Sequence, residues 1–118
     1  MIIGLGVDIV DLNRFERAIT RTPGLLPRLF TVSERVLPVH SLAARFAAKE
    51  ALMKALGDTT GFRWHDMEII GDEDRKPALT LRGEVLRNAQ ARGVMSTHLS
   101  LSHDAGIALA FVILESAP

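Results

Sequence analysis

The chain of 118 residues contains no cysteine. This absence excludes disulfide bonds and thiolate metal sites, and it fits a reducing compartment such as the cytoplasm. The 14 basic and 14 acidic side chains cancel, so the overall charge gives no indication of nucleic acid or an anionic membrane as a partner. We therefore expect a cytoplasmic protein that binds neither, and any basic binding surface must be local.

Common motifs of phosphate binding and covalent catalysis are also absent. Gly4 and Gly6 lack the third glycine and the helix start of a dinucleotide-binding loop, and no Walker-type loop is present. No serine stands in a nucleophile-elbow pattern, so covalent catalysis has no candidate nucleophile. The first residues carry no positive charge and reach an acid at Asp8, so we interpret them as part of the fold rather than as a signal peptide or membrane span.

The length is typical of one domain, and we predict a single domain over residues 1–118. Hydrophobic residues make up 47% of the chain, which suits a packed core with additional apolar surface to bury against copies of itself. A chain of this size is short for enclosing a large ligand alone. We therefore favour an oligomer with clefts between subunits.

Hydrophobic spacing predicts the elements of the first half of the chain. Residues 2–10 are expected to form a strand, with the apolar side chains on one face and Gly4, Gly6 and Asp8 on the other. A helix at 12–20 would be capped by Asp11. Thr31 and Glu34 have the spacing of a capping box, which predicts a short helix that Pro38 ends.

The second half is predicted to contain a long helix, a hairpin, a further helix and a second hairpin. The expected ranges are a helix from about 41 to 56 ended by Gly57, strands at 67–70 and 78–81 around a charged turn at 71–76, a helix at 83–91, and strands at 98–102 and 107–114. This order predicts an α+β domain in which a largely antiparallel sheet packs against a long central helix.

The predicted central helix carries the most specific pattern in the chain. Charged residues interrupt its apolar positions: Glu50 and Lys54 share one face, and Arg45 and Lys49 form a second pair beside it. One carboxylate therefore lies among three cations. In an isolated helix such a pair contributes only about 0.2–0.5 kcal/mol at the surface, so the pattern alone leaves a structural and a functional interpretation open.

Asp8 and His103 are the other unusual polar residues. A carboxylate beside glycines in an apolar strand is costly unless a cation meets it, and that cation is either a metal or a basic side chain. Asp8 and Glu50 together would be a typical protein contribution to a Mg²⁺ site, while a local cap or salt bridge explains Asp8 equally well. His103 follows Ser102 at a hairpin tip, where hydroxyls and backbone donors suit an anion, although turn histidines are more often surface residues.

This inventory suits direct displacement at a phosphate, in which positioning and charge stabilisation supply most of the catalysis. Three motifs then resemble one family. They are Gly6-Val7-Asp8-Ile9-Val10 with Arg14-Phe15, Arg45-Phe46-Ala47-Ala48-Lys49-Glu50-Ala51 with Lys54-Ala55 and Gly57, and Ser100-Leu101-Ser102-His103. In this order they resemble the holo-[acyl-carrier-protein] synthases, the small bacterial class of 4′-phosphopantetheinyl transferases.

The resemblance implies the phosphopantetheinyl transferase fold and a Mg²⁺-dependent reaction. In that reaction the 4′-phosphopantetheine group passes from coenzyme A to a serine of apo acyl carrier protein, adenosine 3′,5′-bisphosphate is released, and fatty acid biosynthesis is supported. The resemblance further implies a homotrimer with active sites between subunits.

The resemblance also implies roles for individual residues. Asp8 and Glu50 match the metal ligands, and Arg14 and Arg21 match residues that receive the acidic carrier protein. The implied coenzyme-binding residues are Arg45, Lys49, Lys54, Gly57, Ser102 and His103. Glu50, Lys54 and His103 are the implied catalytic residues. The proton acceptor for the serine stays open among Glu50, a metal-bound water, His103 and Asp104.

Two other functions also fit parts of the pattern. A different Mg²⁺-dependent phosphoryl enzyme acting on a small nucleotide would use the acids but not the arginines of the first helix. In a non-catalytic, oligomeric nucleotide-binding regulator, Asp8 and Glu50 would be structural.

Overall fold

The computed structural model describes residues 1–71 and 76–118. Residues 72–75, within the predicted charged turn, lie outside the described residues. The elements in chain order are β1 (Ile2–Asp11), α1 (Leu12–Arg21), α2 (Leu25–Leu29), α3 (Val32–Arg35), α4 (Val39–Leu56), the 3₁₀ turn η1 (Trp64–Asp66), β2 (Met67–Gly71), β3 (Pro77–Leu81), α5 (Gly83–Ala91), β4 (Val94–Asp104) and β5 (Ile107–Ser116).

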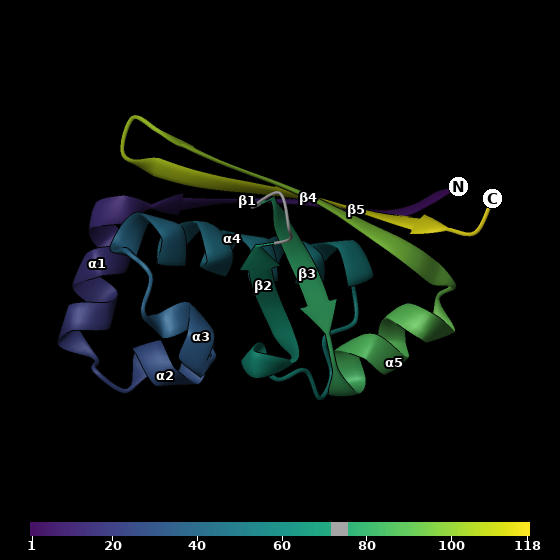
Figure 1. Ribbon diagram of the computed structural model, residues 1–118, viewed down its shortest axis with the longest axis horizontal. Helices are drawn as coiled ribbons and strands as arrows, with labels where there is room; N and C mark the ends of the chain where they lie inside the picture. The colour runs from purple at the N-terminus through teal and green to yellow at the C-terminus, as the bar shows by residue number, and fades with distance from the viewer. Residues whose placement is uncertain (72–75) are drawn as a thin grey trace.

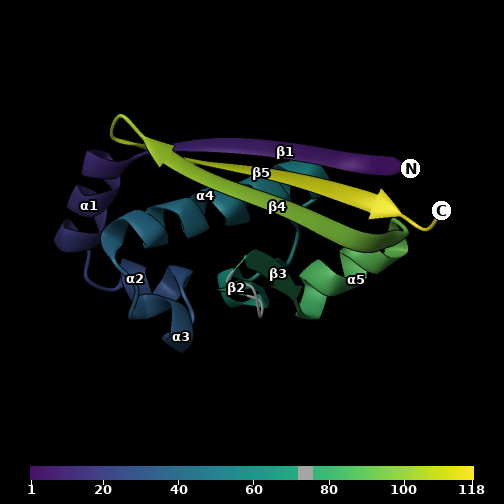
Figure 2. The ribbon, with the colours of Figure 1, turned by 45° about the horizontal axis from the view of Figure 1, so that its top comes forward.

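The strands form a three-stranded sheet in the order β1-β5-β4 and a separate β2-β3 hairpin, and every pairing is antiparallel. The sheet is one layer and α4 lies directly beneath it; α1 stands beside the start of α4, and α2, α3, α5 and the hairpin lie below (Figures 1 and 2). The predicted α+β class with a long central helix is therefore confirmed. Among the described residues, no helix is long and apolar enough to cross a membrane.

Small residues allow α4 to lie unusually close to β1. A side chain at Gly6 would overlap the carbonyl oxygen of Ala51, and one at Gly4 would meet the carbonyl oxygen of Ala55. Only glycine permits this approach of two backbones. Because side chains alternate along a strand, Asp8 shares the face of Gly4 and Gly6 and is carried toward α4.

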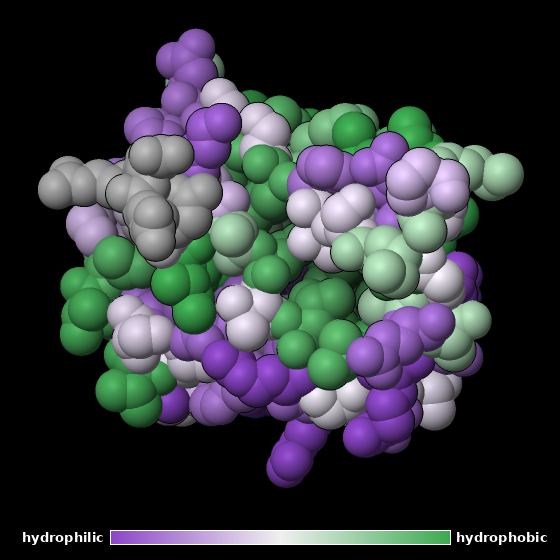
Figure 3. Space-filling view, turned by 45° about the vertical axis from the view of Figure 1, so that its right-hand side comes forward, coloured by the Kyte–Doolittle hydropathy of each residue, from purple (hydrophilic) through white to green (hydrophobic). Residues whose placement is uncertain are grey.

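The opposite face of β1 is apolar and exposed. Leu5, Val7 and Ile9 are 56%, 46% and 59% exposed. Val7 is paired with Phe111 of β5, which is 38% exposed, so the apolar surface continues onto the neighbouring strand. Hydrophobic residues also appear along the upper edge of Figure 3, on the side where the sheet lies in Figure 1. We call the outer surface of β1 and β5 around these residues the outer sheet face.

Several boundaries differ from the predicted ones. α4 begins at Val39 rather than near residue 41, because Pro38 is its extended N-cap and the Pro38 carbonyl accepts from the Leu42 N–H at 3.0 Å. β4 begins at Val94 rather than 98, since its first residues pair with the end of β5. The short elements α2 and η1 were not predicted. Both prove important for the site.

Glu68 of β2 lies in a polar network that was not predicted either. Its carboxylate accepts hydrogen bonds from the hydroxyl groups of Thr31 and Ser33. It also forms an ion pair with Arg82, whose Nη2 lies 2.8 Å from Oε1 of Glu68. Burial alone raises the pKa of Glu68, but these three donors outweigh it and hold the pKa at about 2. The network connects β2 to α3 and to the residue before α5.

We expect Glu68→Gln to lower the free energy of unfolding at neutral pH by about 1–3 kcal/mol, because three donors lose a buried, charged acceptor. The folded-state pKa of about 2 lies below the ordinary value of 4.5. The stabilisation is therefore complete above about pH 4.5 and is lost as the pH falls toward 2. Urea unfolding of both proteins across this range measures it, and a difference independent of pH would contradict the assignment.

Candidate active site

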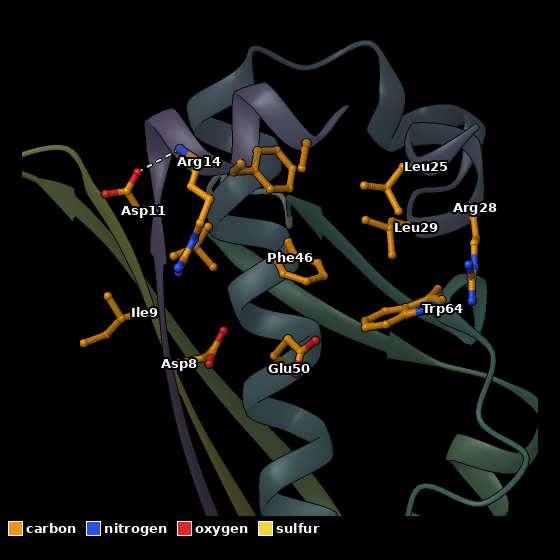
Figure 4. Close-up of a pocket in the computed structure, with 13 residues that line it drawn as sticks. Asp8, Ile9, Asp11, Arg14, Leu25, Arg28, Leu29, Phe46, Glu50 and Trp64 are labelled. Carbon is orange, nitrogen blue, oxygen red and sulfur yellow. Dashed lines mark hydrogen bonds between the residues drawn. The ribbon is translucent and has the colours of Figure 1, made fainter. Parts of the chain in front are cut away.

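A cleft of about 610 Å³ opens between β1, α1, α2, α4 and η1. Asp8 reaches it from β1 and Glu50 from α4, and Figure 4 shows the two carboxylates side by side on one wall. Arg14 extends from α1 along the same side. The opposite wall consists of residues from α2 and η1, including Leu29 and Trp64. The fold therefore gathers two acids that are distant in the sequence.

Lys54 meets Asp8 directly. Its ammonium lies 3.0 Å from Oδ1 of Asp8 and donates to the carbonyl of Val7 at 3.0 Å. Lys54 is one turn beyond Glu50 on α4, yet it forms its ion pair with Asp8 of β1 rather than with Glu50. The expected cation beside Asp8 is therefore present as a basic side chain.

Glu50 lies in an environment that disfavours its charge. Burial raises the pKa of Glu50 above its ordinary value, the negative charge of Asp8 raises it further, and Lys54 lowers it only in part. Two carboxylates that repel each other favour an additional cation between them. The arrangement is therefore electrostatically suited to a divalent ion.

The donor set also limits which ion would fit. Within the described ranges, no three histidine, cysteine or acidic side chains gather as a complete protein cage would require. Mg²⁺ is commonly bound by one or two carboxylates, with waters and substrate phosphates as its other ligands. Asp8 and Glu50 fit that mode of binding.

The cleft also contains residues that the sequence did not single out. Arg28 of α2 adds a second arginine to the lining, whereas Arg21 is exposed on α1 outside it. Phe46 stacks between Phe15 and Trp64, with ring centroids 5.8 and 5.7 Å away. Phe46 was part of the central motif, and Trp64 is the only tryptophan of the chain. Neither the motif position of Phe46 nor the presence of a single tryptophan predicted that these side chains line a cleft.

Lys49 is buried in the core, which contradicts the role implied for it. Its implied role was coenzyme binding, but the side chain is 0% exposed and its ammonium lies 2.7 Å from Oε1 of Glu34, which is 1% exposed. Burial lowers the pKa of Lys49, and the hydrogen bond and charge of Glu34 oppose this effect. The predicted capping box of Glu34 with Thr31 is confirmed. Lys49 is therefore used inside the core and cannot reach a ligand in the cleft.

Ser102 and His103 lie away from the cleft. Both belong to β4, and β5 separates this edge strand from β1, which carries Asp8. The ring of His103 packs against His40 at the start of α4, with centroids 5.1 Å apart. His40 had been assigned no role. The carboxylate of Asp104 accepts from the N–H of Ala105 at 2.9 Å, as expected for a turn-forming aspartate.

Arg45 and Gly57 also lie outside the cleft lining. Arg45 is half-buried and donates to the carbonyl of Ser41 at 3.4 Å, while its buried Nε has no hydrogen-bond partner among the described residues. Gly57 has a φ of 85° and ends α4, donating to Met53 as the helix stop that was predicted. The implied site residues thus form two groups, one in the cleft and one outside it.

Comparison with known proteins defines the class. The sequence pattern of the 4′-phosphopantetheinyl transferase superfamily matches residues 4–112, and the chain belongs to this family. It is 65% identical over 115 residues to the holo-[acyl-carrier-protein] synthase of Leifsonia xyli subsp. xyli, covering 98% of each chain. The family that the motifs indicated is therefore confirmed.

Solved structures agree with this relationship. The holo-[acyl-carrier-protein] synthase of Neisseria meningitidis is 35% identical, with a TM-score of 0.84 and coverage of 98% of this chain and 100% of that one. The Helicobacter pylori enzyme, solved in complex with coenzyme A, is 32% identical, with a TM-score of 0.83 and coverage of 94% and 99%.

Proposed function

We propose that the cleft beside Asp8 and Glu50 is where this chain transfers the 4′-phosphopantetheine group of coenzyme A to a serine of apo acyl carrier protein. Family membership supports the reaction, and the solved complex of a relative with coenzyme A supports the donor. The observation that carries the location is the pair of carboxylates beside Lys54 in the large cleft. This function requires the charge stabilisation that such a pair and its cations can provide.

Asp8 and Glu50 would hold Mg²⁺ in this proposal. When bound, the ion supplies charge neutralisation at the pyrophosphate of coenzyme A. Lys54 adds positive charge on the same side, because its ammonium already lies at Asp8. Glu50, His103 and Asp104 are the protein groups that we propose for accepting the proton of the serine.

The proposal includes a homotrimer with shared active sites. The outer sheet face exposes contiguous apolar side chains, which are costly in water and are typical of a subunit interface. Ser102 and His103 lie on the edge strand opposite Asp8, so they can serve a neighbour's cleft more readily than their own. A cleft completed by a second subunit also resolves the difficulty of enclosing coenzyme A in a small chain.

One assay tests the function directly. The protein is incubated with coenzyme A, MgCl₂ and apo acyl carrier protein, and the carrier is examined by mass spectrometry. We expect a mass gain equal to one phosphopantetheine group, dependent on all three components. Hydrolysis of a nucleotide without this gain would favour a different phosphoryl enzyme. Binding of coenzyme A without any reaction would favour a regulator.

Charge reversal on α1 tests the carrier-binding surface. Arg14→Glu/Arg21→Glu is expected to raise the KM for the acidic carrier about tenfold or more, because attraction becomes repulsion. Arg14 also lines the cleft, so Arg14→Glu alone should raise the KM for carrier more than Arg21→Glu alone does. The KM for coenzyme A should change less than about twofold. Steady-state kinetics with each substrate varied in turn gives both values.

Arg87→Glu on α5 is the matched control, because Arg87 is exposed, pairs with Glu84 and does not line the cleft. Added salt should weaken carrier association in the parent and affect the reversed variant less. Identical carrier kinetics in parent and double variant would rule out this surface.

A further inference from the structure

Lys49 contacts the wall of the cleft from behind. Besides Glu34, its ammonium donates to the carbonyl of Leu29 at 2.7 Å and to the carbonyl of Trp64 at 3.3 Å. The side chains of Leu29 and Trp64 both line the cleft. The next residue of α4, Glu50, lines it as well. A single ammonium therefore bonds to the backbones of two wall residues and is adjacent in sequence to the carboxylate they face.

Glu34 gives this ammonium a fixed partner. Its Oε1 also accepts the backbone N–H of Thr31 at 3.0 Å, and its Oε2 accepts the N–H of Ile69 in β2 at 3.0 Å. Both carboxylate oxygens are thus occupied by donors from different elements. The Glu34–Lys49 pair therefore connects α4 to α2, α3, η1 and β2 through hydrogen bonds.

Stability alone does not explain a pair of this kind. Removing two charges from water is expensive, and apolar side chains of similar volume commonly stabilise a core as well as a buried ion pair does. Hydrogen bonds differ from apolar packing in fixing distance and direction. Here the fixed acceptors are a carbonyl at the C-terminal end of α2 and one in η1. These two short elements are also joined to each other, because Nε2 of His65 lies 2.7 Å from the carbonyl oxygen of Pro27, so Lys49 ties a connected wall to α4.

We propose that Lys49, held by Glu34, is a positioning residue of the transfer reaction. It sets the distance of the wall formed by α2 and η1 from Glu50, and thereby the shape of the cleft that receives the carrier protein. The inference rests on the proposed function, since the carrier protein would enter on the side of the cleft lined by Arg14 and Arg28 to reach the group transferred beside Asp8 and Glu50. It replaces the ligand-binding role implied for Lys49.

The decisive variant is Glu34→Gln/Lys49→Met. Lys49→Met alone leaves a buried, unpaired carboxylate and is expected to lower the unfolding midpoint strongly, whereas the double variant removes both charges and should recover much of that loss. The bonds to Leu29 and Trp64 stay absent in both. We expect the double variant to raise the KM for carrier about tenfold while the KM for coenzyme A changes less than about twofold.

Trp64 provides a readout that needs no substrate. It is the only tryptophan of the chain, so its fluorescence reports on the cleft wall alone. Acrylamide quenching should increase in the double variant because η1 is no longer bonded to Lys49. If the proposed function failed, carrier kinetics would be lost for every variant, but this quenching difference would still be measurable.

Glu115→Gln is the control, because it weakens a polar contact with Ser96 and His98 between β5 and β4, outside the residues that line the cleft or bond to Lys49. It should change stability without changing quenching or carrier KM. Glu34→Asp serves if the double variant does not fold, since it keeps the charge but withdraws the carboxylate from Lys49, and it should move both readouts in the same direction. Parent-like quenching and carrier KM in a folded variant would overturn the proposal and leave the pair a purely structural one.

Discussion

Glu50→Gln is expected to lower the rate of transfer at least about a hundredfold, equivalent to about 3 kcal/mol of activation free energy. The change keeps the size and helix propensity of the side chain but removes a carboxylate proposed to hold Mg²⁺. Asp8→Asn should behave similarly. If both acids serve one ion, the double variant should be far less impaired than the product of the two single effects predicts. Single-turnover transfer to apo carrier at fixed MgCl₂ measures these rates.

The same substitution should stabilise the fold without metal. The folded-state pKa of Glu50 is raised by burial and by Asp8, so at neutral pH the charged carboxylate destabilises the folded state relative to the unfolded one. Gln removes this cost. The advantage of Glu50→Gln in unfolding free energy should be largest at neutral pH and decline as the pH falls through the pKa of Glu50, which denaturant unfolding at several pH values measures.

Glu84→Gln is the control for a lost surface charge, because Glu84 is exposed on α5 and pairs with Arg87. It should leave the transfer rate unchanged. Near-normal turnover of folded Glu50→Gln at moderate MgCl₂ would exclude Glu50 as a metal ligand, and a decrease in its stability would contradict the electrostatic argument.

Phe111→Glu is expected to convert the assembly to monomers and to abolish most of the activity. Phe111 lies at the centre of the outer sheet face beside Val7, so a carboxylate there would be buried without a partner on association. The side chain points away from α4, and the monomer should therefore fold. Sedimentation should give the mass of one chain, and binding of coenzyme A should weaken at least about tenfold because half of the composite site is missing.

Val36→Glu is the control, since Val36 is 81% exposed but follows α3 and lies outside the outer sheet face. It should assemble and react as the parent does. The sharing of sites is tested by mixing Glu50→Gln with His103→Ala. Subunit exchange creates some interfaces with both halves intact, so partial activity should return. A fully active Phe111→Glu monomer, or a lack of rescue after proven exchange, would mean that each site lies within one chain. A parent protein that sediments with the mass of one chain would refute the trimer.

The sequence identified charged residues in apolar segments, where burying a charge without a partner is energetically unfavourable. Asp8 stood out because a carboxylate beside Gly4 and Gly6 in an apolar strand needs a cation. Glu50 stood out because a charge interrupts an otherwise apolar helix. Alternation in β1 placed Asp8 on the glycine face, and this is the face that meets α4. Local periodicity and capping chemistry were sufficient for these predictions, since both depend on neighbours within a few residues.

What covers each side of α4 was decided only by the tertiary structure. The helical spacing showed that Lys49 and Glu50 point in different directions, but not that Lys49 enters the core and Glu50 the cleft. That difference depends on α2 and η1, which are too short for a periodic signal and supply Leu29, Arg28 and Trp64. Helix periodicity fixes the angle between two side chains, whereas burial and bonding depend on chain segments packed from elsewhere, which no local pattern contains.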